Sequence, residues 1–314
     1  SECTGSPEYQ TGGMTEPSTI DGGIAILTNT VTKRYKDVVA LDRVDLEVKA
    51  GSVYGLVGPN GAGKTTMLGL VSGLRAPTSG EVDIASPFIG VLPDTPQFDR
   101  WITGREVVEL SRRLADNGTP ASAVDEILGT AGLAEASSRA VKGYSRGMLQ
   151  RLGLAAAVVS EPDILLLDEP AAALDPAGRR EVLDLVRALR GRSTVLFSSH
   201  ILDDVQEVCD EIGILRRGEL VYQGSLDGLL ARHVKRSYDV RVGSGATRVA
   251  KDLESEDWVR SVEVTGDEGL SIGVSNLDAA QAILVQVLAR AEVPVVHVRP
   301  GESSLEEVFL EVTK

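Results

Sequence analysis

The alternation of hydrophobic and polar residues predicts regular structure from about residue 24 onward. Hydrophobic and polar residues alternate over 24–32 and 44–48, as they do in half-buried strands. The apolar run at 53–57 predicts a short buried strand. A glycine-rich segment follows, after which residues 64–72 have the periodicity of a helix. The pattern therefore predicts a strand, a glycine loop and a helix in direct succession.

Between residues 94 and 159 the pattern becomes helical. Thr103 with Glu106 three residues later is typical of a capping box, Thr119 before Pro120 predicts another helix start, and residues 146–159 form a largely apolar helix. Strand-like runs return at 164–167, 194–197 and 211–215, with helical patterns at 177–189 and 201–210 between them. This alternation predicts an α/β fold with a mixed, mostly parallel sheet and a helical subdomain inserted at 95–160.

The pattern restarts after residue 230. A strand at 238–242, a helix at 246–253, a hairpin at 259–274, a helix at 277–291 and a strand at 294–299 follow the βαββαβ order of a ferredoxin-like unit. Ser303, with Glu306 three residues on, predicts the start of a last helix at 304–312. We expect residues 24–230 to form the main domain and residues 231–314 a small C-terminal α/β accessory domain.

Composition narrows the class of protein. The 314 residues are 42% hydrophobic, which is enough for two unequal cores, and no apolar run approaches the roughly 18 to 20 residues of a membrane span. Residues 1–23 are rich in small and polar residues and are predicted to be a disordered tail, with Met14 as a candidate start.

The net charge and the cysteine content argue against nucleic-acid binding, anionic-membrane binding and a cysteine metal site. The net charge of −14 argues against nucleic-acid binding or a generic anionic-membrane surface. Cys3 and Cys209 match no paired metal spacing, and a disulfide between them is not expected, as suits a reducing cytoplasm.

The glycine-rich segment between the predicted strand and helix fits the pattern G-x-x-x-x-G-K-[ST]. Glycines let backbone N–H groups surround phosphate oxygens, and the helix N-terminus adds a favourable dipole. Lys64 would reach the β- and γ-phosphates, and Thr65 would bind Mg²⁺. A plain glycine-rich turn is the alternative, which the flanking strand and helix disfavour. We expect ATP to bind at this segment, called the phosphate loop below: Gly58, Pro59, Asn60, Gly61, Ala62, Gly63, Lys64, Thr65 and Thr66.

Two carboxylates end the apolar strand predicted at 164–167. Asp168 would hold Mg²⁺ through water, and Glu169 could polarise the attacking water. A solvated acidic turn is the simpler interpretation of such a strand end alone. Its position about a hundred residues after the phosphate loop favours a hydrolytic site.

With these motifs in this order, residues 24 to about 230 resemble the ATP-binding cassette (ABC) ATPase family. The segment Tyr144-Ser-Arg-Gly-Met148, followed by Gln150 and Arg151, is similar to the family's LSGGQ signature. The resemblance implies that two ATP-binding subunits, identical or different, enclose two ATP molecules head to tail. The signature of one subunit would then contact the ATP of the other through Ser145, Arg146, Gly147 and Met148. An ordinary helix N-cap at Ser145 is the alternative.

Smaller elements of the family also have counterparts by position. Asp175 resembles the D-loop aspartate, and His200 resembles the switch histidine that contacts the γ-phosphate, so the resemblance implies catalytic roles for Glu169, His200 and Lys64. Tyr35 resembles the aromatic residue that stacks on adenine, although it could also be a packing tyrosine.

The sequence departs from the family at several positions. Asp94 stands where the family usually has the Q-loop glutamine, and it adds negative charge beside ATP. The signature has Tyr144 for Leu, Arg146 for Gly and Met148 for Gln, and Ala172 stands where the D-loop often has Ser. None of these changes removes a phosphate or metal ligand, so we expect hydrolysis.

These variants and the tail at 304–312 resemble the ATPase subunits of multidrug or daunorubicin-resistance exporters. The resemblance implies a peripheral protein on the cytoplasmic face of the membrane, with ATP and Mg²⁺ as cofactors and a separate transmembrane permease as partner. Its cargo would be drugs, lipids or other hydrophobic compounds. Phe98 and Trp101 are candidates for the groove that receives a permease helix, or they simply pack the inserted helices. The alternatives are a soluble ABC ATPase acting on ribosomes or DNA, and a degraded nucleotide sensor.

Overall fold

The computed structural model describes residues 23–172, 174–232, 237–301 and 305–312. The chain divides into two compact units between Leu226 and Asp227, four residues before the predicted boundary. The predicted tail at 1–23 lies almost wholly outside the described residues, as do Met14, Cys3 and the helix start at Ser303.

The first unit is built on a six-stranded sheet in the order β10-β9-β4-β8-β7-β6. Strands β6, β7, β8, β4 and β9 are parallel, and β10 pairs antiparallel with β9. Every residue of β4, β7 and β8 is buried, as expected for central strands covered on both faces. The bounds are β4 Val53–Val57, β6 Ile89–Leu92, β7 Ile164–Asp168, β8 Thr194–Ser199, β9 Glu211–Arg216 and β10 Glu219–Ser225.

A second, antiparallel sheet in this unit was not predicted. Its long strand β1 (Ile24–Tyr35) pairs with β2 (Val38–Val44), β3 (Glu47–Lys49) and β5 (Ser79–Ile84). The prediction of one strand at 44–48 was wrong, because the Thr28 hydroxyl interrupts it: Oγ1 donates to the Val44 carbonyl (3.0 Å) and accepts from the Leu46 N–H (2.8 Å).

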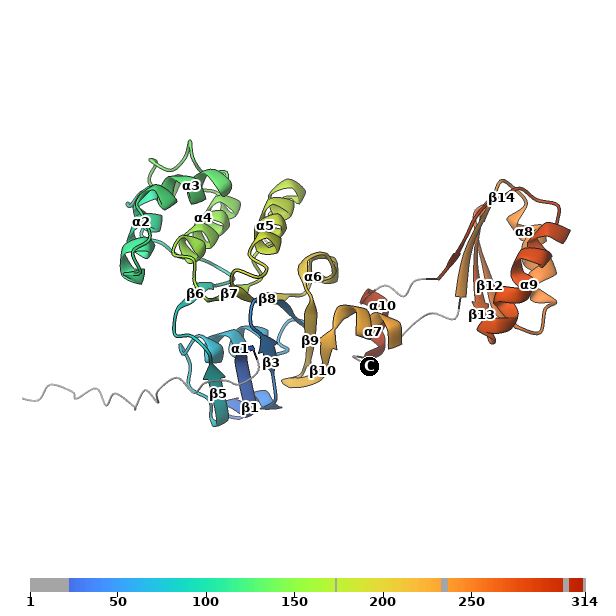
Figure 1. Ribbon diagram of the computed structural model, residues 1–314, viewed down its shortest axis with the longest axis horizontal. Helices are drawn as coiled ribbons and strands as arrows, with labels where there is room; N and C mark the ends of the chain where they lie inside the picture. Colours follow the sequence, from blue (N-terminus) through green and yellow to red (C-terminus); the bar gives the residue numbers. More distant parts are fainter. Residues whose placement is uncertain (1–22, 173, 233–236, 302–304, 313–314) are drawn as a thin grey trace, which may run out of the picture. The chain divides into compact units, whose positions relative to one another are not determined.

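Helices cover the sheets and form the inserted block. Helices α1 (Lys64–Val71), α5 (Pro176–Ala188) and α6 (Leu202–Val208) follow β4, β7 and β8. Figure 1 shows α2 (Gly104–Ala115), α3 (Ser122–Thr130) and α4 (Arg146–Val158) grouped together in green, near β6 and β7. These three helices share their own apolar core, as a separate subdomain requires.

The helix starts of this block test two predictions. The capping box of α2 is confirmed, since Thr103 Oγ1 accepts from the Glu106 N–H (3.2 Å) and a Glu106 carboxylate oxygen accepts from the Thr103 N–H (2.7 Å). The start predicted at Thr119 was wrong, because α3 begins at Ser122. The Thr119 hydroxyl instead donates to Asn117 Oδ1 (2.7 Å) and is engaged in the preceding turn.

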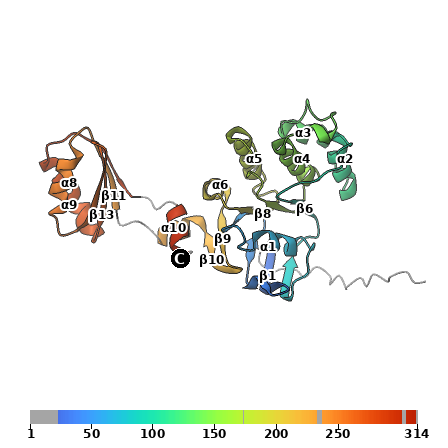
Figure 2. The same cartoon turned by 180° about the vertical axis from the view of Figure 1, so that it is seen from behind.

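The second unit has the predicted ferredoxin-like order of elements. Its antiparallel sheet runs β12-β13-β11-β14, and Figure 2 shows α8 and α9 on one face of it. The apolar positions of β11 and β13 alternate and pack against those helices in a core of the unit's own residues. The bounds are α7 Leu226–Arg232, β11 Ser237–Val242, α8 Ala246–Glu254, β12 Val259–Thr265, β13 Gly269–Val274, α9 Leu277–Arg290, β14 Val295–Pro300 and α10 Leu305–Val312.

None of the described helices is both long and apolar enough to span a membrane. Among the described residues Cys209 is a buried, free cysteine, and burial raises the pKa of its thiol well above the usual value, so it stays protonated and unreactive.

Candidate functional site

The phosphate loop connects the end of β4 directly to the start of α1. Gly61 and Gly63 have φ of 81° and 113°, which side chains rarely allow. A Cβ atom on Gly63 would also lie 2.7 Å from the Ala40 carbonyl oxygen, so the loop packs too closely for any other residue there. The backbone at this point therefore requires glycine.

Lys64 turns back over the loop that precedes it. Its side chain is buried, and Nζ donates to the Gly58 carbonyl (2.7 Å) and lies 3.4 Å from that of Pro59. Nζ also forms an ion pair with Glu169 Oε1 at 3.4 Å. The cation of the phosphate loop thus lies beside the predicted general base.

The acid pair lies where β7 ends. Asp168 is buried, and its Oδ1 accepts a hydrogen bond from the Ser198 hydroxyl (2.5 Å) on the neighbouring strand β8. Glu169 has a left-handed backbone (φ 49°), a conformation that is uncommon for residues with a side chain. Its Oε2 lies 2.7 Å from His200 Nδ1, just beyond β8. Parallel pairing of β7 and β8 therefore joins Glu169 to His200.

Lys64, Glu169 and His200 line one pocket of about 380 Å³, whereas the buried Asp168 is not among its lining residues. The structure brings together most of the phosphate loop with Asp94, Glu169 and His200. Sequence reasoning missed Ala40, which lies on β2 of the antiparallel sheet, because nothing in the sequence relates that sheet to the loop. The residues that line the pocket are Ala40, Asn60, Gly61, Ala62, Gly63, Lys64, Thr65, Thr66, Asp94, Glu169, Ala172 and His200.

Tyr35 does not line this pocket. Its side chain is partly exposed, and its hydroxyl accepts a hydrogen bond from Arg75 Nη1 (2.9 Å). Lys33 Nζ lies 5.2 Å from the centre of the Tyr35 ring, which is within cation–π range.

The signature segment also lies apart from the pocket of its own chain. Ser145 is exposed and caps α4, with Oγ accepting from the Met148 N–H (3.2 Å). Tyr144 is buried just before it, and its hydroxyl donates to the Ala136 carbonyl (2.8 Å). Asp175 likewise caps α5 by accepting from the Gly178 N–H (2.9 Å). The N-termini of both helices are thus ordered by side-chain caps.

Comparison with known proteins identifies both units. Residues 41–172 match the family described as "ABC transporter", and residues 224–313 match "ATP-binding protein DrrA1-3-like, C-terminal domain". The uncharacterized ABC transporter ATP-binding protein YxlF of Bacillus subtilis is 34% identical over 90% of this chain and 97% of its own length. Daunorubicin resistance ATP-binding protein DrrA3 of Streptomyces coeruleorubidus is 35% identical, over 92% and 96% respectively. Bacitracin transport ATP-binding protein BcrA of Bacillus licheniformis is 31% identical over 91% and 96%.

Solved structures show the same cassette fold. The dimeric structure of MJ0796, a bacterial ABC transporter cassette, is 28% identical with a TM-score of 0.60, and the likeness covers 64% of this chain and 98% of that one. The same cassette has been solved in a post-hydrolysis state bound to ADP and Pi, at 27% identity with the same TM-score and coverage. The ribosome- or DNA-acting alternative finds no support among these relatives. The chain belongs to the ATP-binding proteins of ABC transporters, as an ATP-binding and ATP-hydrolysing cassette followed by a DrrA-like C-terminal domain.

Proposed function

We propose that this chain hydrolyses Mg·ATP at the pocket of the phosphate loop to drive a separate exporter permease. The observation that carries the proposal is the convergence of Lys64, Glu169 and His200 in one pocket lined by the phosphate loop. These groups supply a cation for the phosphates, a carboxylate for water and an imidazole beside it.

Phosphate binding follows from the loop geometry. The backbone N–H groups at the start of α1 offer donors to phosphate oxygens, and the helix dipole favours their negative charge. Lys64 Nζ exchanges its contacts with the Gly58 carbonyl and Glu169 for contacts with the β- and γ-phosphates. The exchange replaces a neutral carbonyl acceptor and one carboxylate at 3.4 Å with phosphate oxygens that carry several negative charges.

The residues present fit Mg²⁺. The Thr65 hydroxyl and the Asp168 carboxylate are oxygen donors of the kind that Mg²⁺ takes together with phosphates and water. No group of three or more His, Cys, Asp or Glu residues in the described part of the chain could hold a metal alone. When bound, Mg²⁺ would be held by Thr65 and Asp168 and would neutralise negative charge that develops on the phosphates during transfer.

Hydrolysis is assigned to Glu169. Its carboxylate accepts a proton from the attacking water, and His200 holds the carboxylate at 2.7 Å and can contact the γ-phosphate. Asp94 also lines the pocket with an exposed side chain. As an acid in the Q-loop position it adds negative charge near the γ-phosphate, which weakens ATP binding.

A second cassette completes the site. Ser145, Arg146, Gly147 and Met148 stand at the N-terminus of α4 and do not line the pocket of their own chain. We infer that they contact the ATP of the opposite subunit in a homodimer or a pair of different cassettes, with Asp175 at the same interface. The dimeric structures of MJ0796 support this arrangement for a related cassette. Adenine would stack on Tyr35 near Arg75.

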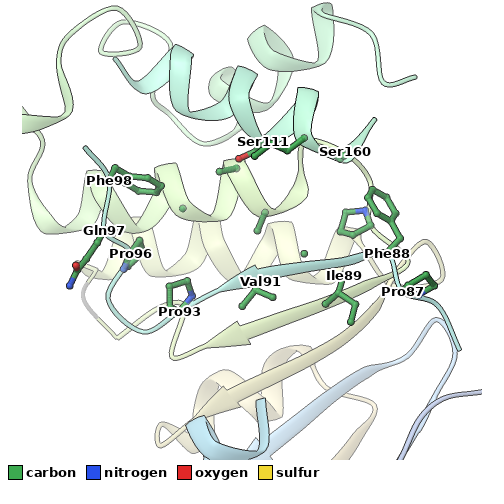
Figure 3. Close-up of a pocket in the computed structure, with 17 residues that line it drawn as sticks. Pro87, Phe88, Ile89, Val91, Pro93, Pro96, Gln97, Phe98, Ser111 and Ser160 are labelled. Atoms are coloured by element: carbon green, nitrogen blue, oxygen red, sulfur yellow. The ribbon is translucent and has the colours of Figure 1, made fainter. Parts of the chain in front are cut away.

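The permease partner has a candidate contact surface. A groove of about 530 Å³ lies between β6 and the helical block. Figure 3 shows the side chains that line it. Most of the residues that line it are of apolar types, among them Ile89, Val91, Phe98 and Leu114. The exposed fraction of Leu114 is 75%, which is high for leucine. Trp101 is equally exposed but does not line the groove. An apolar helix from a permease fits such a surface, and it would hold the cassette at the cytoplasmic face of the membrane.

The cargo is proposed from the relatives alone. Two of them are named for resistance to daunorubicin and for transport of bacitracin. We infer export of drugs, lipids or other hydrophobic compounds.

Glu169→Gln tests the hydrolytic mechanism. Because the amide cannot accept the proton of water, we expect ATP turnover to fall by at least about 100-fold. Nucleotide binding should persist and the dimer with ATP should become more stable. Phosphate release, nucleotide titration and sedimentation measure the three quantities. Undiminished hydrolysis would overturn the assignment.

Co-purification separately tests the proposal that the chain works with a membrane permease. The tagged chain, extracted from membranes in mild detergent, should bring a polytopic membrane protein with it. Substituting Val91 and Leu114 with glutamate should abolish this association and leave nucleotide binding intact, since neither residue lines the nucleotide pocket. A chain that instead sediments with ribosomes and leaves membranes empty would contradict the proposal.

A further inference from the structure

Ser198 lies at the centre of the main sheet, between the two strands that carry the site. It is on β8, in register with Asp168 of β7 on one side and with Leu56 of β4 on the other. Its exposed fraction is 0%. It cannot touch solvent, and it does not line the nucleotide pocket.

The hydroxyl of Ser198 contacts both members of the acid pair. The Glu169 N–H donates to Oγ at 3.1 Å, and Oγ lies 2.5 Å from Asp168 Oδ1. A hydroxyl has one proton, and a backbone N–H can only donate. The proton of Ser198 is therefore directed at the Asp168 carboxylate, which makes a charge-assisted hydrogen bond.

The same serine supports the unusual backbone at Glu169. The Glu169 N–H is also 3.2 Å from the Ser198 carbonyl oxygen. Both oxygens of Ser198 thus accept from the residue whose φ is 49°. A left-handed backbone persists only where its surroundings hold it.

We propose that Ser198 is a positioning residue of the ATPase. Its hydroxyl fixes the orientation of the Asp168 carboxylate toward the metal and, through the same oxygen, the backbone that aims Glu169 at water. This inference rests on the proposed hydrolysis of Mg·ATP. One buried hydroxyl orients both Asp168 and Glu169, so its loss should affect metal binding and the chemical step together.

The chain offers a matched control for simple loss of a buried serine. Ser193, just before the start of β8, is also buried, and its hydroxyl donates to the Pro162 carbonyl at 2.7 Å. It contacts neither acid. Ser193→Ala therefore removes one buried hydrogen bond next to the same strand without touching the site.

The experiment compares Ser198→Ala, Ser198→Cys and Ser193→Ala with the unmodified full chain. Cysteine keeps the shape of serine with a larger atom and is only a weak donor, so it fills the site without a cavity if alanine does not fold. A fluorescent ATP analogue is titrated at a series of Mg²⁺ concentrations and in EDTA, and kcat and KM are measured by phosphate release.

Both Ser198 variants should need about 10- to 100-fold more Mg²⁺ for half-maximal nucleotide binding, the usual effect of losing a group that orients a metal ligand. Their kcat should fall by a similar factor, whereas affinity in EDTA should match the unmodified chain. Ser193→Ala should keep the unmodified Mg²⁺ requirement.

Two results would overturn the inference alone: Ser198 variants with an unchanged Mg²⁺ requirement, or an equal shift in Ser193→Ala. An unmodified chain that neither binds nucleotide with Mg²⁺ nor releases phosphate would instead overturn the proposed function, and this inference with it.

Discussion

The side chains around the phosphate loop were predictable to different degrees. Lys64 and Thr65 belong to a local strand, loop and helix, so their neighbourhood is encoded within a dozen residues. The ion pair of Lys64 with Glu169 joins residues about a hundred positions apart. It depends on which strands are neighbours in the sheet, and that is settled by tertiary packing. The role of Ser198 could not be predicted for the same reason, because its neighbours in the sequence indicate only the end of a strand.

Asp94→Asn tests the effect of the acid at the Q-loop position. Asp94 lines the pocket that would hold the negative charges of ATP. Removing one exposed negative charge should favour ATP by on the order of 1 kcal/mol, or about fivefold in Kd. The gain should shrink at high salt, because screening weakens exposed charges.

Asp99→Asn is the control for this change. Asp99 is exposed on the same segment but does not line the pocket. Equilibrium nucleotide titration at two ionic strengths measures both variants. Equal affinities for the two would show that Asp94 does not act on ATP through its charge.

Among the elements, those with strong patterns were predicted and weak or short ones were missed. The apolar strands β4, β7 and β8 are buried on both faces, and their runs of Val, Leu and Phe are distinctive. β5 begins Ser-Gly-Glu and has no clear alternation, and β6 has only four residues. These strands are stabilised by pairing with strands that are distant in the sequence, and a local pattern carries no information about such pairing.

The start of α2 packs against Tyr144, which precedes Ser145, the N-cap of α4. A Cβ atom on Gly104 would overlap the hydroxyl of Tyr144, which bonds to Ala136. Gly104→Ala should therefore displace Tyr144 and the adjoining Ser145. We expect kcat to fall by up to about 100-fold, as small misplacements at a reacting centre can cause, with nucleotide affinity of the single chain unchanged.

Gly129→Ala serves as the comparison for this variant. Gly129 lies on α3 of the same block, and a Cβ atom there meets nothing within 4 Å. This variant should keep the unmodified kcat in a phosphate-release assay. If both variants have equal kcat, the contact between Gly104 and Tyr144 does not position the signature.

For the whole molecule, each of the two units has apolar cores made of its own residues. The core beneath the phosphate loop uses residues up to Leu220, and the core of the second unit uses residues from Tyr238 to Val298. The order of the elements indicated both units. The exact point of division could not be predicted, because α7 has too few residues to mark it by pattern.

A chain that ends at residue 232 should bind nucleotide as tightly as the full chain. Every residue that lines the pocket precedes Ile201, and the core that supports them lies in the retained part. Nucleotide titration, together with the rise in thermal midpoint on adding ADP, measures this. Loss of affinity after truncation would mean that the second unit supports the nucleotide site directly.

β6 is the last strand of the main sheet, and it also borders the apolar groove. Such an edge strand has backbone N–H and C=O groups with no neighbouring strand, and Val91 on it is 37% exposed. Long, flat edges of this kind recruit strands from other molecules, whereas a very short edge strand resists such pairing. Because β6 has only four residues, the main sheet stays protected at this edge even where the proposed permease does not cover the groove.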